Sequence, residues 1–288
     1  MKPAPFEYVV AGSPAEAVSA LASYEGDARI LAGGQSLVPM LNMRLLRPAA
    51  VVDVNRIEGL GEVRAGGGQV RIGALARYAT LEFSPVVNQL LPLLAEAVLF
   101  VGDRQVRNRG TMGGSLAQAD PSGEMPLVAL ALGATVTVLG PGGERAVPAA
   151  DLFLGPYQTS LEPEEMITEA AFPVGAGSVS ALVEHVRRHG DFAVLAVAAV
   201  GEPGGEGRWR SVRLALAGVG PHAFVAEEAS AMLSGTALEP EAVRAAGEAC
   251  ARAADPSSDV RASAEYRRHL VPLYVERVLD RLRERRAA

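Results

Sequence analysis

Two glycine-rich segments constrain the backbone of this chain more than any other feature of its sequence. Residues 32–37 (AGGQSL) and 110–115 (GTMGGS) each hold a Gly-Gly pair with a serine close behind it. Because glycine has no Cβ, its backbone reaches positive φ values and exposes bare N–H groups to a ligand. The first segment follows a predicted strand and opens a predicted helix, where unpaired N–H groups favour anions. Two such segments suit a diphosphate; the alternative is that both pairs are ordinary tight turns.

The spacing of these glycines excludes the commonest nucleotide sites. Neither segment has the G-x-G-x-x-G spacing of a Rossmann dinucleotide site. Neither fits the P-loop pattern G-x-x-x-x-G-K-[ST], and the only lysine of the chain is Lys2. Ser36 and Ser115 are predicted to cap the two turns or to donate to a phosphate oxygen. The predicted ligand is therefore a diphosphate that needs no lysine.

Hydrophobic periodicity and turn residues predict a mixed α+β architecture. The GAGS segment at 175–178 is the best linker candidate, and antiparallel strands followed by two helices are expected beyond it. The predicted strands are 29–34, 51–54, the hairpin 62–74, 135–139, 164–173, 182–186, 192–200 and 208–219. The predicted helices are 13–24, 36–46, 84–102, 125–132, 240–254 and 264–286. Residues 103–123 favour neither structure.

Composition excludes several classes of protein. Of the 288 residues, 49% are hydrophobic and 21% are charged, which is typical of a globular chain and not of a disordered one. The net charge of −6 argues against a nucleic-acid binder. One cysteine, Cys250, cannot form an intrachain disulfide, a four-cysteine zinc site or an iron–sulfur cluster. The longest uncharged stretch, 125–143, is too interrupted to span a membrane, and the N-terminus lacks a signal peptide's apolar core, so the cytoplasm is expected.

Three segments identify the chain by resemblance. Residues 32–45, 101–126 and 187–199 (RRHGDFAVLAVAA) resemble, in family order, the FAD-binding medium subunit of the molybdenum hydroxylases, which include xanthine dehydrogenase and carbon monoxide dehydrogenase. The resemblance implies a FAD-binding fold of the vanillyl-alcohol-oxidase-like type. It places a FAD-binding domain at 1–174, with subdomains at about 1–55 and 56–174. A C-terminal domain of antiparallel sheet followed by helices is expected at 178–288.

The same resemblance implies which residues contact FAD. Val101 and Gly102 match the segment that passes the flavin ring, and Ile167 matches an apolar residue near the cofactor. Asp191 and Phe192 match the pair at the isoalloxazine. The residues that match the two pyrophosphate loops, which bind through backbone amides, are Leu31, Ala32, Gly33, Gly34, Gln35, Ser36 and Leu37, with Thr111, Met112, Gly113, Gly114 and Ser115.

Two further acids are candidates, and simpler roles stand beside each assignment. Glu124 matches an acid near the ribityl or ribose hydroxyls, but it also suits the dipole at a helix start. Asp120 is a candidate FAD contact or a turn former before a proline. Asp191 and Phe192 would otherwise be a turn acid and a core residue at the start of an apolar strand.

Other residues narrow the expected chemistry. Relatives that use NAD carry a phenylalanine at the position aligned with Val101 and a lysine near Val183. This chain has neither, which makes NAD a doubtful acceptor. His185 and His189 have a helical i, i+4 spacing but lie in a strand pattern, so no metal site is expected. Neither glycine segment holds histidine or cysteine, so the FAD is expected to be non-covalent. Arg107, like Arg109, favours a structural ion pair over pyrophosphate contact.

The resemblance therefore implies an electron-transfer flavoprotein subunit with no catalytic side chain of its own. A large partner subunit would carry molybdopterin and a small one two [2Fe–2S] clusters, in a dimer of heterotrimers. Electrons would pass from the clusters through FAD to an external acceptor. One alternative is a stand-alone FAD-dependent oxidoreductase, for which Glu184 and Asp191 are the only acid–base candidates. The other is a non-enzymatic interaction module whose glycine loops are structural.

Overall fold

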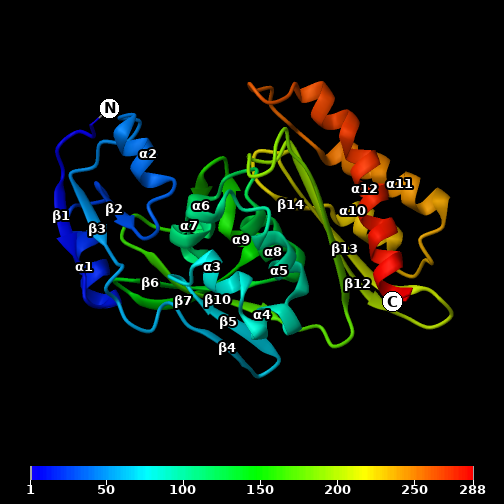
Figure 1. The fold of residues 1–288 in the computed structure, drawn as a ribbon, viewed down its shortest axis with the longest axis horizontal. Helices are drawn as coiled ribbons and strands as arrows, with labels where there is room; N and C mark the ends of the chain where they lie inside the picture. Colours follow the sequence, from blue (N-terminus) through cyan, green and yellow to red (C-terminus); the bar gives the residue numbers. More distant parts are fainter. Residues whose placement is uncertain (1, 288) are drawn as a thin grey trace.

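The computed structural model describes residues 2–287, which form three lobes side by side (Figure 1). The first lobe has a parallel sheet of order β1-β3-β2 with two helices. Its elements are β1 (Glu7–Val10), α1 (Pro14–Ser23), β2 (Ala28–Leu31), α2 (Leu37–Asn42) and β3 (Ala50–Asp53). The Ser13 hydroxyl accepts a hydrogen bond from the Glu16 amide and caps α1, as the sequence predicted.

The central lobe contains a five-stranded antiparallel sheet of order β4-β5-β10-β6-β7. The strands of this sheet are β4 (Val63–Gly66), β5 (Gln69–Gly73), β6 (Thr135–Gly140), β7 (Gly143–Pro148) and β10 (Met166–Pro173). A separate two-stranded sheet is formed by β8 (Phe153–Gly155) and β9 (Gln158–Thr159). Its helices are α3 (Tyr78–Glu82), α4 (Pro85–Leu90), α5 (Pro92–Val98), α6 (Arg104–Arg109), α7 (Met112–Gln118), α8 (Glu124–Leu132) and α9 (Ala149–Leu152). Helix α1 packs against β6 and β10 and joins the first lobe to the second.

The third lobe has an antiparallel sheet of order β11-β12-β13-β14, covered on both faces. Alternate side chains of β12 face opposite sides. Ala196 and Ala198 join the core of the central lobe, while Val197 and Ala199 join the core formed with the C-terminal helices. The elements are β11 (Val179–His185), β12 (Leu195–Pro203), β13 (Trp209–Ala217), β14 (Phe224–Val225), α10 (Glu227–Leu233), α11 (Pro240–Ala253) and α12 (Ala264–Ala287).

The fold confirms the predicted architecture but changes two segments. The helical pattern at 84–102 is two helices, because Leu91 leaves helical geometry and Pro92 starts α5. Proline lacks the N–H of a helix interior and clashes with the preceding turn, which explains the break. The ambiguous segment 103–123 forms α6 and α7. By contrast, α12 continues through Pro272.

The basic end of α12 protects the exposed edge of the C-terminal sheet. Arg281 and Arg285 donate to the carbonyls of Leu182 and Ser180 on β11, each at 2.7 Å. Glu96 of α5 pairs with Arg285 at 2.8 Å, which ties the central lobe to the C-terminal helix. Covering an edge strand removes a template for unwanted strand pairing. Within residues 2–287, no helix combines the length and apolar character needed to cross a membrane.

Candidate functional site

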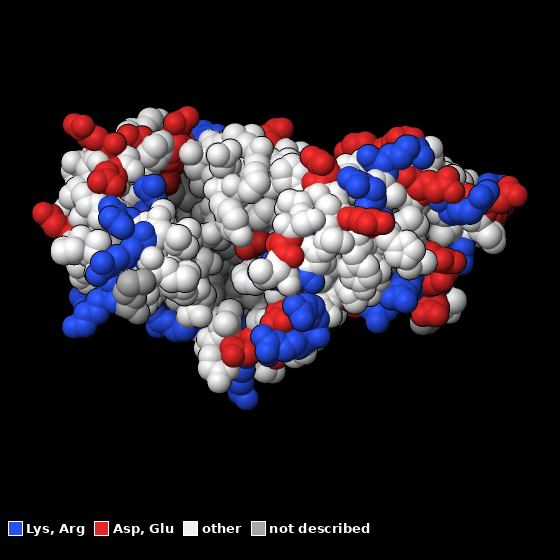
Figure 2. All heavy atoms as spheres, turned by 90° about the horizontal axis from the view of Figure 1, so that it is seen from above, with Lys and Arg blue, Asp and Glu red and all other residues white. Residues whose placement is uncertain are grey.

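A cavity of about 920 Å³ lies between the first and central lobes and reaches the C-terminal lobe at one end. Figure 2 shows the molecular surface hollowed between the lobes. The volume is in the upper part of the range for small-molecule and cofactor sites, roughly 300–1,000 Å³. Every residue predicted to contact the cofactor lines this cavity except Leu31 and Met112. Leu31 ends β2, and the Met112 side chain is fully buried.

The first glycine loop presents unused backbone donors to the cavity. Gly34 has a φ of +75°, a conformation that favours glycine, and Gly33 and Gly34 both line the cavity. Within residues 2–287, the amides of 33–36 donate no hydrogen bond. Ser36 occupies the N-cap of α2 but makes no capping bond with its side chain. Four consecutive amides and a hydroxyl are thus without a partner in the described residues and available to an anion.

In the second glycine loop, the amides of 112–115 are already engaged. The Met112 and Gly113 amides donate to the carbonyls of Ala76 and Ala74 at 3.0 and 2.9 Å. The Thr111 hydroxyl accepts from the Gly114 amide at 3.2 Å and caps α7. Of the two roles predicted for Ser115, the capping role is wrong: α7 begins at Met112, so Thr111 holds the N-cap and Ser115 lies inside the helix. This loop offers hydroxyls and a bare helical surface rather than free amides.

The two loops touch each other through Gly33. A Cβ built on Gly33 would lie 2.2 Å from the Arg109 carbonyl oxygen and 3.0 Å from Gly110 Cα. No side chain fits in this space, so glycine is required for the approach. The two loops therefore lie side by side in the wall of the same cavity.

The segment after α5 and the loop before β12 form another part of the cavity wall. The backbone of Gly190 approaches the Gly102 carbonyl, and Val101 is 9% exposed. Asp191 pairs with Arg188 at 3.1 Å. The ring of Phe192 is half exposed and has the Arg261 guanidinium 5.0 Å from its centroid, a cation–π distance.

The expectation that Asp191 and Phe192 begin a strand is wrong. Strand β12 begins at Leu195. Gly190 has a φ of +82°, and the Arg188–Asp191 ion pair closes a turn around it. This turn leaves Phe192 in the loop, on the cavity wall and outside the core.

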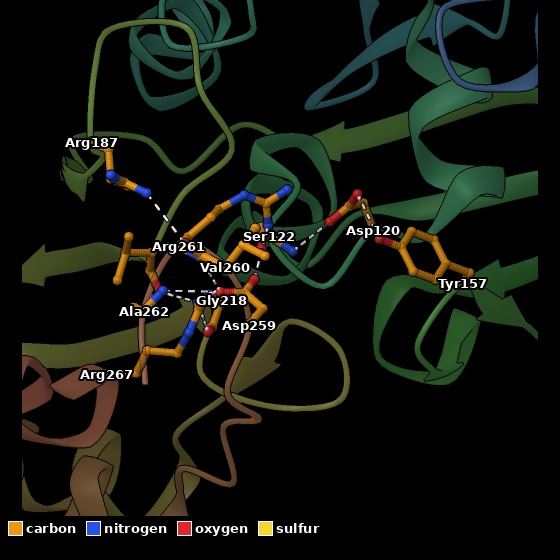
Figure 3. Close-up of polar contacts among 11 residues, drawn as sticks. Asp120, Ser122, Tyr157, Arg187, Gly218, Asp259, Val260, Arg261, Ala262 and Arg267 are labelled. Carbon is orange, nitrogen blue, oxygen red and sulfur yellow. Dashed lines mark hydrogen bonds and ion pairs between the residues drawn. The ribbon is translucent and has the colours of Figure 1, made fainter. Parts of the chain in front are cut away.

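Asp120 and Glu124 are two of the carboxyls that line the cavity. Asp120 accepts from the Ser122 amide at 2.8 Å and from the Tyr157 hydroxyl at 3.3 Å, and burial raises its pKa (Figure 3). Glu124 starts α8 and is 9% exposed, and burial raises its pKa to about 7. No other side chain in the described part of the chain donates to Glu124. Its carboxyl is thus free to bond a ligand hydroxyl, the role that the resemblance implied.

A third buried carboxyl lies outside the cavity lining. Both carboxylate oxygens of Glu184 are inaccessible and have no hydrogen-bond partner. Burial, with a smaller contribution from the charge of Glu124, raises the pKa of Glu184 to about 8. Glu184 is therefore not placed to act on a molecule bound in the cavity.

The structure adds residues that the sequence analysis missed. Asn55 donates to the carbonyls of Leu31 and Ala32 at 3.2 and 2.9 Å and so holds the first loop. Arg77 donates to the Asn55 side chain and to the Arg109 carbonyl, and so connects the two loops. A signal for Asn55 existed: it follows β3, which is parallel to β2, and parallel strands end at the same sheet edge.

A loop of the C-terminal lobe also reaches the site. Figure 3 shows Arg261 and Asp259 close to Ser122 and Asp120. The Arg261 amide donates to Asp259 at 2.9 Å, and Arg267 pairs with the same carboxylate at 2.9 Å. These bonds hold Arg261 over Phe192. Because this loop lies about 70 residues beyond Phe192 in the chain, no local pattern pointed to it.

The remaining candidates have structural roles. Arg107 pairs with Glu82 at 3.0 Å and donates to the Val101 and Gly102 carbonyls, so it supports the cavity wall instead of lining it. His185 shares hydrogen bonds with two tyrosines of α12 and does not line the cavity. Among residues 2–287, no group of three or more histidine, cysteine, aspartate or glutamate side chains is placed to hold a metal ion.

Comparison with known proteins agrees with this geometry. Residues 4–175 match the FAD binding domain in molybdopterin dehydrogenase, and residues 180–282 match the CO dehydrogenase flavoprotein C-terminal domain. The chain is 41% identical over 280 residues to the 6-hydroxypseudooxynicotine dehydrogenase complex subunit alpha of Paenarthrobacter nicotinovorans, covering 97% of this chain and 95% of that one. It is 39% identical over 281 residues to the carbon monoxide dehydrogenase medium chain of Hydrogenophaga pseudoflava, covering 97% and 98%.

The structural comparison extends over almost the whole chain. A solved structure of carbon monoxide dehydrogenase from Hydrogenophaga pseudoflava matches with a TM-score of 0.97 and 40% identity, covering 99% of both chains. Quinoline 2-oxidoreductase from Pseudomonas putida 86 matches with a TM-score of 0.93 at 34% identity, covering 99% of each chain. The predicted fold is confirmed, and the chain belongs to the family of FAD-binding subunits of the molybdopterin dehydrogenases.

Proposed function

We propose that this chain binds FAD non-covalently in the cavity and passes electrons through it as the medium subunit of a molybdenum hydroxylase complex. The observation that carries the proposal is the cavity itself. Its lining combines the unused amides of 33–36 and the second glycine loop with the side chains of Val101 and Phe192. A long ligand that carries both a diphosphate and an aromatic system fits this set of groups.

The residues present fit FAD in particular. The first loop would donate amides to the diphosphate, and the Thr111 and Ser115 hydroxyls would face it from the second loop. Glu124 would accept from a sugar or ribityl hydroxyl, and Asp120 lies beside it. Val101, Ile167 and Phe192 would flank the isoalloxazine, with Asp191 at its edge. Bound FAD supplies the ability to accept and release electrons.

The protein's own contribution is binding, orientation and exclusion of water. Val101 and Ile167 are 9% and 5% exposed, which makes the flavin end of the cavity apolar. Asp191 is paired with Arg188, and Glu184 does not line the cavity, so neither offers an unpaired base to a substrate there. This arrangement supports electron transfer more than acid–base chemistry on a substrate, and no catalytic side chain is assigned.

The other redox centres would lie on partner subunits. The only cysteine, Cys250, is buried in the third lobe and cannot bind a cluster alone. We therefore propose a large molybdopterin subunit that oxidises the substrate and a small subunit with two [2Fe–2S] clusters. The names of the relatives, a complex subunit and a medium chain, support a multisubunit assembly. A dimer of heterotrimers in the cytoplasm is the proposed form, and mass measurement and cell fractionation test it.

A visible absorption spectrum tests the central proposal. The chain, purified alone and after co-expression with the large and small subunits, should show flavin absorption bands and about one FAD per chain. Heat or acid should release the FAD intact, because no histidine or cysteine lies in either glycine loop. Chains that are colourless in both preparations, and that gain no flavin on incubation with FAD, would contradict the proposal and favour an interaction module. Steady turnover of a small substrate by the isolated chain would favour a stand-alone oxidoreductase.

A further inference from the structure

Asn55 and Arg77 form a continuous hydrogen-bonded connection between the two glycine loops. The Asn55 side-chain amide donates to the carbonyls of Leu31 and Ala32, at the start of the first loop. Its side-chain oxygen accepts from Arg77 at 2.5 Å, and the other terminal nitrogen of Arg77 donates to the Arg109 carbonyl, just before the second loop. Each loop is thus held at its backbone by one member of the pair.

The connection is anchored on both sides. Asp53, at the end of β3, accepts from the Asn55 amide at 2.8 Å and from its side chain at 2.6 Å. Arg77 precedes α3 and forms an isolated antiparallel bridge with Thr111, the residue that caps α7. Both ends therefore rest on regular structure, one in the first lobe and one in the central lobe.

Neither Asn55 nor Arg77 lines the cavity. The Arg77 guanidinium has one terminal nitrogen committed to each neighbour, and its planar fork matches two separate acceptors at once. Its partner carbonyl on Arg109 is also the atom that Gly33 approaches most closely. Any shift of Arg77 would therefore change the distance between the two loops without changing a residue that a ligand touches.

We propose that Asn55 and Arg77 act as a brace that sets the spacing of the two loops for a diphosphate. They are positioning residues: they act through the loop backbones and not by contact with the ligand. The proposal rests on the proposed role of the loops in FAD binding. The spacing matters because the first loop offers free amides while the second offers side-chain hydroxyls, and both sets must reach the same diphosphate.

A distance measurement tests the brace without any ligand. Nitroxide labels at Val38→Cys and Asn108→Cys would report the separation of the two loops by double electron–electron resonance. Both sites are exposed and neither lines the cavity, while Cys250 is fully buried and will not be labelled. The wild-type background should give one narrow distance. The Arg77→Met and Asn55→Ala backgrounds should each give a broadened or shifted distance.

Binding measurements on the unlabelled full chain, alone or with its co-expressed partner subunits, complete the test. Arg77→Met should weaken FAD binding at least about tenfold, and it should weaken binding of ADP, which has the diphosphate but no flavin, by a similar factor. The double variant with Asn55→Ala should lose no more than the weaker-binding single variant, because the two residues act through one connection. Arg71→Met, which removes an exposed ion pair with Glu169 elsewhere on β5, is the matched control and should bind like wild type.

Four results separate the explanations. Arg77→Lys keeps the positive charge but not the fork, so it should resemble Arg77→Met; full recovery by lysine would overturn the brace in favour of simple charge attraction. An unchanged label distance in Arg77→Met would also overturn it. Loss of FAD in Gly34→Val together with wild-type FAD affinity in Arg77→Met would overturn the brace alone. Retention of FAD by Gly34→Val would overturn the assignment of the loop, and the brace with it.

Discussion

The two glycine loops have similar sequences but opposite hydrogen-bond states. In the first loop, the amides of 33–36 make no hydrogen bond within residues 2–287, and Asn55 holds only carbonyls. In the second loop, the amides of Met112, Gly113 and Gly114 are bonded to Ala76, Ala74 and Thr111. The first loop is therefore built to donate to a ligand, and the second is built as a fixed wall. A Gly-Gly pair in a sequence does not by itself tell which of the two it forms.

The largest effect should come from Gly34→Val in the first loop. A β-branched side chain is strained at a φ of +75°, and its Cβ would meet Val38 and Leu31 at 3.1 and 3.2 Å. The displaced amides should cost at least about a hundredfold in FAD affinity, or about 2.7 kcal/mol. Fluorescence titration with FAD measures the loss, and circular dichroism checks that the chain is folded. Wild-type FAD affinity in a folded Gly34→Val chain would contradict the inference that the first loop donates to the ligand.

In the second loop, Gly113→Ala should act on stability first. A Cβ at Gly113 would lie 2.5 Å from the Ala74 Cβ and 2.9 Å from its Cα, so α7 must move away from the chain after β5. Overpacking of this kind costs about 2 to 3 kcal/mol of unfolding free energy. Urea unfolding of the FAD-free chain measures it. If Gly113→Ala were as stable as wild type, the second loop would not be the fixed wall inferred here.

The free energy of unfolding should depend on pH through buried carboxyls such as Glu124, which lies on the second-loop side of the cavity. The first loop has no ionisable group and should contribute no such dependence. Burial raises the pKa of Glu124 to about 7 and that of Glu184 to about 8, above the ordinary glutamate value of 4.5. At a pH between 4.5 and each raised pKa, the folded chain keeps a proton on that carboxyl that the unfolded chain has released. Its unfolding free energy should therefore fall as pH rises from about 5 to about 8.

Urea unfolding across this pH range should show a loss of several kcal/mol, because each group contributes a slope of up to about 1.4 kcal/mol per pH unit between the ordinary value of 4.5 and its raised pKa. Glu124→Gln should flatten the curve up to about pH 7, and Glu184→Gln should flatten it up to about pH 8. Glu165→Gln serves as a control: its hydrogen bonds with Arg145 lower the pKa of that carboxyl below 4.5, so this substitution should leave the slope between pH 5 and pH 8 unchanged. A stability curve that rises over this range would contradict the protonated state of the two buried carboxyls.

The smallest effect should separate the two helix caps. Thr111→Val removes the hydroxyl that accepts from the Gly114 amide and should cost about 1 kcal/mol of unfolding free energy. Ser36→Ala removes no capping bond, so its effect on the stability of the FAD-free chain should stay within about 0.5 kcal/mol. Chemical denaturation of both variants measures the difference. Equal losses would show that the two loop starts are capped alike.

The sequence was sufficient for the main strands and helices of the fold and for most of the predicted contact residues, which line the cavity, but it missed elements such as β1, β7, α3 and α10. Glycine, proline and the alternation of apolar residues mark strand and helix limits locally, which is why the hairpin at 62–74 and the C-terminal helices agree with the structure. The break at Pro92 follows from proline chemistry as well. What could not be predicted depends on distant partners. The state of the second loop depends on Ala74 and Ala76, and the roles of Arg77 and Arg261 depend on where other lobes bring them.

Hydrogen exchange of the loop amides, with and without FAD, tests the account most directly. Without FAD, the amides of 33–36 should exchange rapidly, whereas those of 112–114 should be protected by their bonds to Ala76, Ala74 and Thr111. With FAD bound, the first group should become protected and the second should change little. Amides at 33–36 that exchange at the same rate with and without bound FAD would contradict the claim that this loop grips the diphosphate.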